Sequence, residues 1–367
     1  MDAGMTPEMS GFSQRFCVVQ AKSPMRFEIR GALIQDEKEL VRLAQFLNSV
    51  NLPDDPAYIR SLLEHSERSF SGAIASAPHR KYVFLIWDHD QNRAVGTSMI
   101  VAQLGRRDAP YIYLDVIDEE KYSKLLDRHF HHTALRLGFS YAGPTEIGGL
   151  VVAPESRASR EKLGLQISYV RFLFIASHMG LFQDEILAEL LPPLESDGTS
   201  YLWEALGRRF TDMSYLEADR LSSENKEFIR DLFPTGLIYA SVLSKEAQDV
   251  VGKVGAQTKG VEKMLRRIGF RYADRVDPFD GGPHFVAPTD EITLIQNARM
   301  TRIARVLESA PDSPLALIGR DHDGPPYYRA VATPVTDSGE DGVCIPRNAA
   351  ERMQLSEGDP VQFLPLR

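Results

Sequence analysis

Hydrophobic and polar positions form short alternating or compact apolar stretches along much of the chain, a pattern that predicts β-strands. Residues 26–34 alternate, 82–87 form a compact apolar run, and 94–102 follow that run after the polar turn 88–92. Two apolar runs joined by a short polar turn are typical of a β-hairpin. We therefore predict a hairpin over residues 82–102 and further strands at 111–116 and 146–152.

Other segments carry apolar residues three and four positions apart, which predicts amphipathic helices. The first helices are expected at 36–50, with Asp36 placed to cap, and at 57–67. A long helix is expected at 162–179. The rest of the pattern predicts helices at 183–191, 201–210, 217–221, 224–233, 245–251 and 260–268, and strands at 237–243 and 270–276.

The same pattern divides the chain into three regions. Residues 1–25 lack a periodic pattern and are expected to be loosely ordered. Residues 26–288 form the main region, with a helical insertion at 181–235. From about residue 289, short strands alternate with Pro, Gly and Asp turns, which predicts a small, β-rich, barrel-like domain over 289–367.

Composition narrows the class of protein. The 367 residues are 43% hydrophobic and 25% charged, which is ordinary for a globular protein with a sizeable core. The net charge of −9 argues against binding of nucleic acid or anionic lipid by overall electrostatic attraction. The only two cysteines, Cys17 and Cys344, exclude a disulfide framework. With no apolar run of membrane-spanning length and no signal-peptide pattern, we expect a soluble, cytoplasmic protein.

The chemistry-bearing segment is a glycine-containing strand followed by a basic loop and the long helix. Gly148 and Gly149 allow the strand to bulge and to splay from its neighbour, which frees backbone groups for the amides of pantetheine. Arg157, Arg160 and Lys162 then bring positive charge to a helix N-terminus, which suits a pyrophosphate. The order of elements predicts an α+β, GNAT-like acyltransferase fold with a central mixed sheet flanked by helices. A charged helix start without a ligand is the alternative interpretation.

Several longer stretches carry a family resemblance. They are Leu243-Ser-Lys-Glu-Ala-Gln-Asp-Val-Val-Gly252, Gly269-Phe-Arg-Tyr272 followed by Asp277-Pro-Phe-Asp-Gly-Gly-Pro283, Trp203-Glu-Ala-Leu-Gly-Arg-Arg-Phe210, Glu146-Ile147 and Arg171-Phe172. In these stretches the chain resembles the arginine N-succinyltransferase family. The resemblance implies succinyl-CoA as donor and the α-amine of arginine as acceptor. It also implies CoA binding by Leu150 and Val152 on the strand and by the loop from Arg157 through Arg160 and Lys162 to Gly164.

The chain departs from the family pattern where that pattern carries catalytic and binding side chains. Gly255 stands at the position of the family's proposed proton-donating histidine, and Ser241 replaces a second histidine. Ser214 stands in place of an aspartate, and Leu191 in place of an arginine. Arginine recognition calls for fixed carboxylates and an arginine clamp. These differences therefore predict that arginine is a poor acceptor or none.

Three side chains are candidates for the chemistry. Glu146 begins the central strand, where a carboxylate can act as general base for the attacking amine; the alternative is a strand-end salt bridge. Tyr239 or Ser241 could protonate the departing thiolate, although a tyrosine packed in the core fits the pattern equally well.

Candidate substrate-binding residues lie in two further segments. Asp280 and Gly281 belong to the turn 279–283, where the alternative role is turn architecture, and His131 belongs to the run 129–132. His129 and His131 would share a strand face, but no third ligand is evident, so we predict no metal site there.

The sequence thus predicts an acyl-CoA-dependent N-acyltransferase that transfers succinyl or acetyl directly to an amine of an amino acid or related small molecule. Its donor would be succinyl-CoA or acetyl-CoA, with no tightly bound cofactor, nucleic acid or membrane partner. The alternative is a catalytically silent relative that binds CoA or a protein as a sensor or scaffold. The end of the chain, 345–359, resembles a swapped-hairpin barrel and is interpreted as a packing or dimerisation element, which leaves a homo-oligomer open.

Overall fold

The computed structural model describes residues 25–46, 52–222 and 225–366. Two expectations therefore lie outside the described residues: nearly all of the loosely ordered segment 1–25, and the end of the first predicted helix at 47–50. No helix in the described part of the chain is long and apolar enough to cross a membrane.

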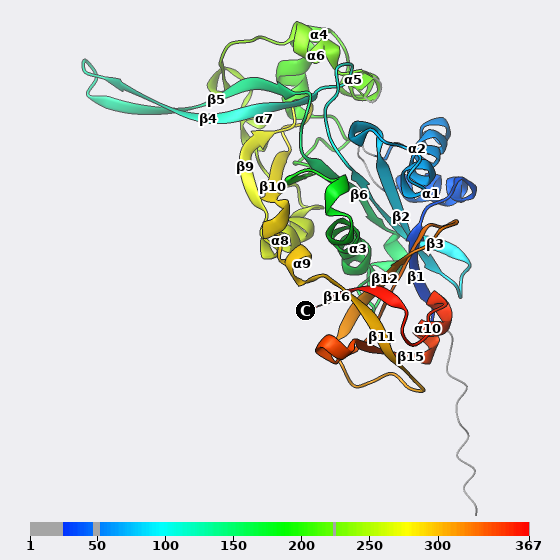
Figure 1. Ribbon diagram of the computed structural model, residues 1–367. Helices are drawn as coiled ribbons and strands as arrows, with labels where there is room; N and C mark the ends of the chain where they lie inside the picture. Colours follow the sequence, from blue (N-terminus) through cyan, green and yellow to red (C-terminus); the bar gives the residue numbers. More distant parts are fainter. Residues whose placement is uncertain (1–24, 47–51, 223–224, 367) are drawn as a thin grey trace, which may run out of the picture.

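The described residues form sixteen strands that join in one continuous sheet (Figure 1). The strands are β1 (Phe27–Gly31), β2 (Lys81–Asp88), β3 (Arg93–Val101), β4 (Tyr111–Ser123), β5 (Arg128–Ser140), β6 (Thr145–Val152), β7 (Glu185–Glu189), β8 (Ile238–Tyr239), β9 (Arg271–Val276), β10 (Pro283–Pro288), β11 (Arg299–Leu307), β12 (Leu315–Asp321), β13 (Tyr328–Pro334), β14 (Thr336–Asp337), β15 (Val343–Pro346) and β16 (Pro360–Pro365). Their order across the sheet is β14-β15-β11-β16-β12-β13-β1-β2-β3-β6-β7-β10-β9-β4-β5-β8.

Helices cover both faces of the central strands. They are α1 (Glu37–Ala44), α2 (Pro56–Phe70), α3 (Leu163–Ser177), α4 (Arg208–Thr211), α5 (Tyr215–Ser222), α6 (Glu227–Leu232), α7 (Lys245–Val250), α8 (Lys259–Arg267), α9 (Thr293–Asn297) and α10 (Arg347–Met353). A π-helical turn at Trp203–Gly207 precedes α4. This mixed sheet with flanking helices confirms the predicted α+β, GNAT-like fold.

Strand β2 is buried on both faces, between the helix α3 on one side of the sheet and the helices α1 and α2 on the other. Phe84 and Ile86 pack into the core under α3, while Val83 and Leu85 pack into the core under α1 and α2. Successive side chains of a strand point to opposite faces, so a continuous apolar run is what a strand buried on both faces requires. The predicted hairpin with β3 is confirmed, since β2 and β3 pair antiparallel along their lengths.

The C-terminal strands have a core of their own but continue the main sheet. Ile318, Val331 and Phe363 belong to a separate hydrophobic cluster beneath α10. Strand β13 nevertheless pairs with β1, with Ile29 opposite Ala330. The β-rich region is therefore joined to the rest by backbone hydrogen bonds as well as by the chain.

The glycine-containing strand bulges as predicted. Thr97 on β3 pairs with Val151, and Met99 pairs with Gly148, so the two β6 residues Gly149 and Leu150 face one residue of β3. Gly149 has φ +56°, and a Cβ there would lie 2.8 Å from Cγ of Met99. Only glycine adopts this conformation freely.

The splay of β6 from its other neighbour is also present. Strands β6 and β7 pair in parallel only at Thr145 with Ile186 and at Glu146 with Leu187. Beyond that point β6 leaves β7, at the same place where the bulge turns it. The backbone of β6 after Glu146 is therefore not paired with β7.

Several elements differ from the sequence prediction. Segment 183–191 is not a helix: it contains β7, so the expected helical insertion 181–235 begins with a central strand of the sheet. The strand predicted at 237–243 is limited to β8, and Ala240–Val242 form a 3₁₀ turn. Strand β10 follows the turn 279–283 and was not predicted. Asp36 precedes α1 but does not cap it; its carboxylate accepts from the Leu33 amide and binds Arg30.

Strands β4 and β5 extend far beyond the body of the protein (Figure 1). They pair with each other from Tyr111 opposite Ser140 to Ser123 opposite Arg128. Among the described residues, other strands pair with β4 and β5 only near the body: β9 at residues 114–115 and β8 at 134–135. We call the two-stranded part 117–133 the arm.

Candidate active site

A cleft opens where β6 and β7 separate. We call it the β6–β7 cleft. Its walls are the backbone and side chains of 147–150 on β6 and 188–191 at the end of β7, together with Arg171 of α3 and residues Thr258, Val261 and Leu265 at and after the start of α8. The cleft therefore lies directly beside the bulge at Gly149.

A second pocket adjoins this cleft, and we call it the Glu146 pocket. It has a volume of about 130 Å³. Glu146 and Glu189 supply carboxylates, Tyr58 and Tyr111 supply hydroxyls, and the basic side chains lining it are those of Lys81, Arg106 and Lys226. Glu189 lines both the pocket and the cleft, so this one carboxylate forms part of the wall between them.

The two carboxylates lie on adjacent strands. Glu146 is 5% exposed and pairs across the parallel ladder with Leu187, two residues before Glu189. Residues two apart on a strand share a face. Burial raises the pKa of Glu189 well above its usual range, and the charges of Glu146 and Asp277 raise it further. The pocket thus concentrates negative charge that a cationic amine would relieve.

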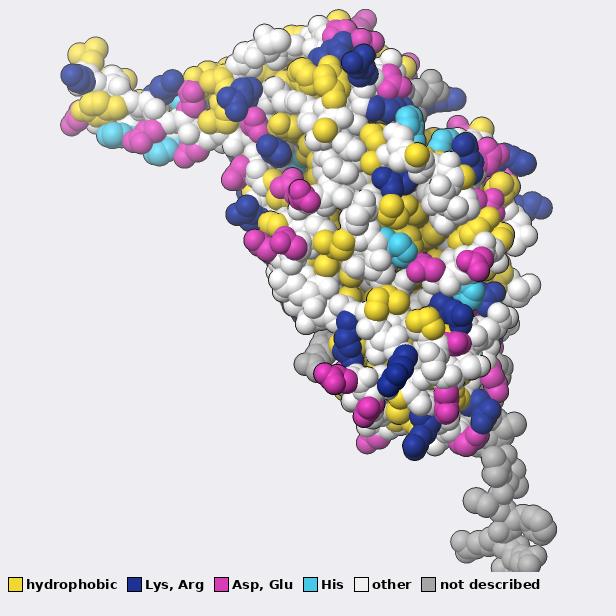
Figure 2. All heavy atoms as spheres, in the orientation of Figure 1, with side chains coloured by type: hydrophobic (Ala, Val, Ile, Leu, Met, Phe, Trp, Pro, Cys, Tyr) yellow, Lys and Arg dark blue, Asp and Glu magenta, His cyan; other side chains and the backbone are white. Residues whose placement is uncertain are grey.

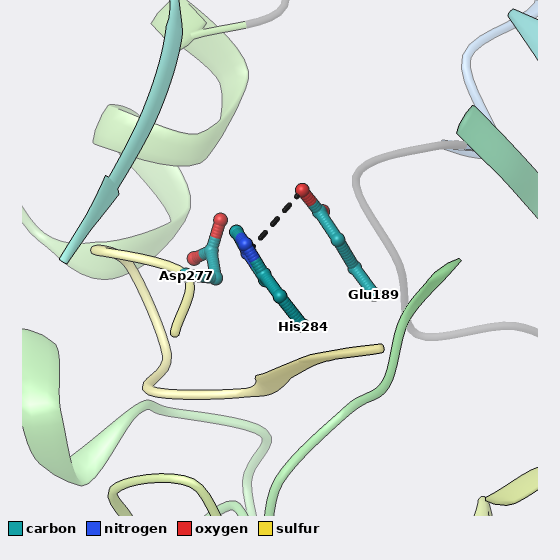
Figure 3. A group of neighbouring side chains, drawn as sticks. All are labelled: Glu189, Asp277 and His284. Carbon is teal, nitrogen blue, oxygen red and sulfur yellow. Dashed lines mark ion pairs between the residues drawn. The ribbon is translucent and has the colours of Figure 1, made fainter. Parts of the chain in front are cut away.

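Glu189 also faces a buried histidine. His284 on β10 is its direct antiparallel partner, with Nε2 of the ring 3.5 Å from Oε1 of the carboxylate (Figure 3). The ring Nδ1 and the hydroxyl of Tyr111 are 2.9 Å apart. Burial lowers the pKa of His284 to about 3, with Arg275 and Lys226 adding to the effect, so the ring is neutral.

Asp280 and Gly281 form the turn that brings β10 back beside β9. Gly281 has φ +80°, as expected of a glycine-dependent turn. Asp280 is buried, and its Oδ1 accepts a hydrogen bond from the Gly282 amide at 2.7 Å. Burial and the charge of Asp277 raise the pKa of Asp280. The observed contacts of Asp280 are those of a turn residue close to the Glu146 pocket.

The basic loop lies between β6 and α3. Arg157, Arg160 and Lys162 are all exposed. Nε of Arg157 donates to the Val152 carbonyl at 2.9 Å, which occupies one of the backbone groups of a predicted CoA-binding residue. Lys162 has φ +54°, the left-handed conformation that favours glycine, and helix α3 begins at the next residue.

The two remaining predicted CoA-binding residues adjoin the cleft and the loop. Leu150 lines the β6–β7 cleft and is half of the bulge. Gly164 lies in the first turn of α3, where a Cβ would meet nothing closer than Val152 at 3.7 Å. The strand, loop and helix start are therefore contiguous in space as well as in sequence.

Tyr239, Ser241 and His131 are not brought together with Glu146. Strand β8, which carries Tyr239, lies six positions from β6 in the sheet, or about 29 Å along it at the usual strand spacing. The Tyr239 hydroxyl donates to Glu119 on β4 at 2.6 Å, and Ser241 is exposed. His131 is exposed on the arm, where its ring lies 3.4 Å from Asp118.

Gly255 lies beside the end of β7. Its amide donates to the Leu191 carbonyl at 2.8 Å, and a Cβ there would lie 2.7 Å from the carbonyl oxygen of Pro192. The hydroxyl of Thr258 donates to the same Leu191 carbonyl at 3.0 Å and lines the β6–β7 cleft. The position that carries the family's histidine therefore borders the cleft but is closely packed by backbone.

Arg171 is a buried cation at the base of the cleft. It is 2% exposed, and its hydrogen bonds within the described residues go to Ser168 and to the Gly148 carbonyl, not to a carboxylate. Burial lowers the pKa of Arg171 to about 9, so it remains charged at neutral pH. A buried cation without an anionic partner is suited to an anionic ligand group.

Sequence reasoning missed Glu189 as a site residue and gave His284 no defined role. Glu189 lies in the segment predicted as a helix, where its partners could not be inferred. The sequence did contain a sign of strand β10. A Gly-Gly turn is followed by the mostly apolar run Pro283 to Pro288, and this order is typical of a strand that returns antiparallel to the one before the turn.

Comparison with known proteins identifies the family. The family described as "Arginine N-succinyltransferase beta subunit" matches residues 27–294, and its C-terminal domain matches residues 299–365. The chain belongs to the arginine N-succinyltransferase family. The resemblance inferred from the sequence is thereby confirmed.

Individual relatives of this family cover nearly the whole chain. Arginine N-succinyltransferase of Escherichia coli O6:K15:H31 is 29% identical over 341 residues, covering 92% of this chain and 97% of that protein. The protein of the same name from Shigella dysenteriae serotype 1 is also 29% identical with the same coverage. The solved structure of arginine/ornithine succinyltransferase subunit AI from Pseudomonas aeruginosa superimposes with a TM-score of 0.79 at 26% identity, covering 93% of this chain and 98% of that one.

Proposed function

We propose that this member of the family is an acyl-CoA-dependent N-acyltransferase acting on a small-molecule amine. The observation that carries the proposal is the position of Glu189 in the wall shared by the β6–β7 cleft and the Glu146 pocket. A thioester in the cleft and an amine in the pocket would meet at that wall. Two substrates held side by side in this way support direct transfer in a ternary complex.

The donor would follow the strand, loop and helix start. Pantetheine amides would pair with the β6 backbone freed at Gly149 and Leu150, and the pyrophosphate would lie over the exposed loop 157–164. The N-terminal amides of the fifteen-residue helix α3, with Arg160 and Lys162 nearby, would carry the phosphate charge. Acyl-CoA is a substrate in this scheme, so we propose no tightly bound cofactor for the acyl transfer itself.

Arg171 favours succinyl-CoA over acetyl-CoA as donor. In the cleft, the terminal carboxylate of a succinyl group would meet the buried guanidinium of Arg171, which has no acidic partner among the described residues. An acetyl group has no carboxylate that could pair with the Arg171 guanidinium. A hydrogen bond between charged groups typically contributes about 1.5–3 kcal/mol, enough to separate the two donors.

Glu146 would act as general base. The amine must lose a proton to attack the thioester carbonyl, and a buried carboxylate in the acceptor pocket can take it. The new C–N bond forms as the C–S bond breaks, and the thiolate leaves as CoA. Because Gly255 has no side chain and Tyr239 lies elsewhere in the sheet, we assign the proton on the leaving sulfur to water; a thiol has a pKa of about 8.5, so little assistance is needed.

The charges of the Glu146 pocket support an amino acid or related amine as acceptor. Its carboxylates suit an ammonium group, and Lys81 and Arg106 suit a carboxylate. The replacements at Leu191, Ser214 and Gly255 support the further proposal that arginine is turned over poorly. The same replacements favour the second candidate, a catalytically silent relative that binds CoA or a protein as a sensor or scaffold. The Glu146 pocket, which carries a buried carboxylate next to the cleft, favours the acyltransferase over the silent relative.

Mass spectrometry of the purified chain, followed by an amine screen, tests these proposals. We expect a copurified or tightly binding acyl-CoA, and acylation of an amino acid or small amine other than arginine. Succinylation of arginine at a typical enzyme rate, about 10 per second, would overturn the acceptor proposal. CoA binding without turnover of any amine would favour a silent relative that binds CoA. Absence of CoA binding would overturn the acyltransferase and leave only a silent relative that binds a protein.

We further propose that the protein is cytoplasmic and self-associates through its arm. Figure 2 shows hydrophobic, acidic and histidine side chains along this projection. Leu125 is 95% exposed, Leu126 60% and Tyr122 50%. A two-stranded hairpin is marginally stable by itself in water, and a second copy that buries these side chains would stabilise it.

A further inference from the structure

Three potential metal ligands from different segments meet beside the Glu146 pocket. Glu189 comes from β7, His284 from the opposite position of β10, and Asp277 from the turn that follows β9 (Figure 3). Each offers one ligand atom, and these atoms all lie within 4.8 Å of one another. Two ligands of a tetrahedral ion with bonds of about 2.05 Å are separated by about 3.3 Å. The 3.5 Å between Nε2 of His284 and Oε1 of Glu189 is close to that value.

The histidine presents its ligand atom without another partner. His284 is 0% exposed, and its Nε2 has no hydrogen-bond partner among the residues that the structure describes. A buried polar atom without a hydrogen bond is energetically unfavourable, so the free imidazole nitrogen next to two carboxylates favours binding of an ion there.

The outer contacts of the ligands are those of a built site. Nδ1 of His284 is held by the Tyr111 hydroxyl at 2.9 Å, which fixes the ring and directs Nε2 toward the carboxylates. Oδ1 of Asp277 accepts from the amides of Phe279 at 2.7 Å and Asp280 at 3.2 Å, which orients its other oxygen. Ligating histidines and carboxylates in proteins are usually held by outer hydrogen bonds of this kind.

We propose that Glu189, Asp277 and His284 form a binding site for one divalent transition-metal ion, with Zn²⁺ as the expected occupant. One imidazole nitrogen with two carboxylate oxygens is a donor set for zinc or a neighbouring first-row metal, whereas Mg²⁺ and Ca²⁺ prefer oxygen alone. Three protein ligands leave a position open for water or a substrate atom. The site goes beyond the acyl transfer proposed above and does not depend on it.

The test measures the ion directly, in the absence of CoA and amines. The full chain is stripped with a chelator, titrated with ZnCl₂ by calorimetry, and loaded with Co²⁺ to record its visible ligand-field spectrum. We expect one ion per chain and a cobalt spectrum of low coordination number. Glu189→Gln and Asp277→Asn preserve side-chain size, and each should weaken binding at least about 100-fold with an unchanged circular dichroism spectrum.

The exposed histidines of the arm provide the matched control. His129 lies beside Glu120, and His131 beside Asp118, so the arm could bind zinc weakly at its surface. A His129→Ala, His131→Ala double variant should retain the full stoichiometry and affinity. Loss of binding in that variant, unchanged binding in Glu189→Gln and Asp277→Asn, or no binding to the wild-type chain at about 100 µM zinc would each overturn the proposal.

Discussion

Glu189 and His284 lie directly opposite each other on β7 and β10, with 3.5 Å between the carboxylate Oε1 and the ring Nε2. This pair joins two features of the protein. Glu189 forms part of the wall between the β6–β7 cleft and the Glu146 pocket, and His284 links that wall to Tyr111 in the same pocket. The donor, acceptor and metal sites proposed above therefore share one carboxylate.

Glu146→Gln keeps the shape of the proposed base and removes its basicity. We expect normal CoA binding and a loss of at least about 10²-fold in turnover, the usual range for a lost general base. Tyr239→Phe is the control, since its hydroxyl contacts Glu119 far from the pocket, and it should lose much less. Full turnover by Glu146→Gln on an identified acceptor would make Glu146 structural.

Replacing Arg160 and Lys162 together by Glu tests the phosphate site. Both side chains are exposed, so each contact with phosphate is partly screened by water. We expect acyl-CoA binding to weaken about 10–100-fold in calorimetry. Arg209→Glu, which changes an exposed arginine on α4, should leave the affinity unchanged. Equal affinities for the double variant and the wild type would place the site elsewhere.

Arg171→Gln tests the choice of donor. We expect the variant to lose the preference for succinyl-CoA, with the ratio of the two dissociation constants shifting about 10–100-fold toward acetyl-CoA. The ratio is informative even if the variant is less stable, because both donors are measured on the same folded protein. An unchanged ratio would show that Arg171 only supports the backbone at Gly148.

Gly149→Ala tests the bulge. A left-handed conformation and a Cβ 2.8 Å from Met99 should together lower the free energy of unfolding by about 1–3 kcal/mol. Gly164→Ala is the matched control, because a Cβ there has room and the residue is helical, and its effect should stay within about 0.5 kcal/mol. Urea unfolding measures both; similar stabilities for the two variants would contradict the strain argument.

Introducing negative charge at the tip of the arm tests whether the arm mediates self-association. Leu125→Glu with Leu126→Glu should convert an oligomer to a monomer in sedimentation velocity, because both side chains are largely exposed in the single chain and would be buried between copies. The unfolding midpoint of the monomer should change little. If the wild-type chain sediments as a monomer, or the double variant remains associated, the arm has another role.

The hydrophobic pattern was sufficient to predict strands that pair with a neighbour close in sequence. The β2–β3 hairpin has both its strands and its turn in one stretch of sequence, and the apolar run of β2 already indicates burial on both faces. The bulge followed from Gly148 and Gly149, since few residues other than glycine accept a positive φ. The motif stretches likewise identified the family, and with it the fold.

The hydrophobic pattern gave a wrong prediction for β7, a strand that lies between two strands far from it in sequence. In 183–191, Ile186, Leu187 and Leu190 have helical spacing, yet β7 pairs with β6, forty residues earlier, and with β10, about a hundred residues later. Backbone hydrogen bonds to both neighbours outweigh a local helical preference. The same insertion brings Glu189 to His284, and no spacing in the sequence reveals it.

By itself, the sequence determined the family, the GNAT-like layout, the bulged strand and the basic loop, because each depends on residues close together in the chain. Only the tertiary structure decided which distant side chains meet. It brought Glu146, Glu189 and His284 to adjoining strands, with Asp277 in the turn after β9 beside them. It left Tyr239, Ser241 and His131 on or next to the outer strands of the sheet. The physical reason is that sheet order is set by the joint burial of all strands, so residues far apart in sequence become neighbours through packing that no single segment encodes.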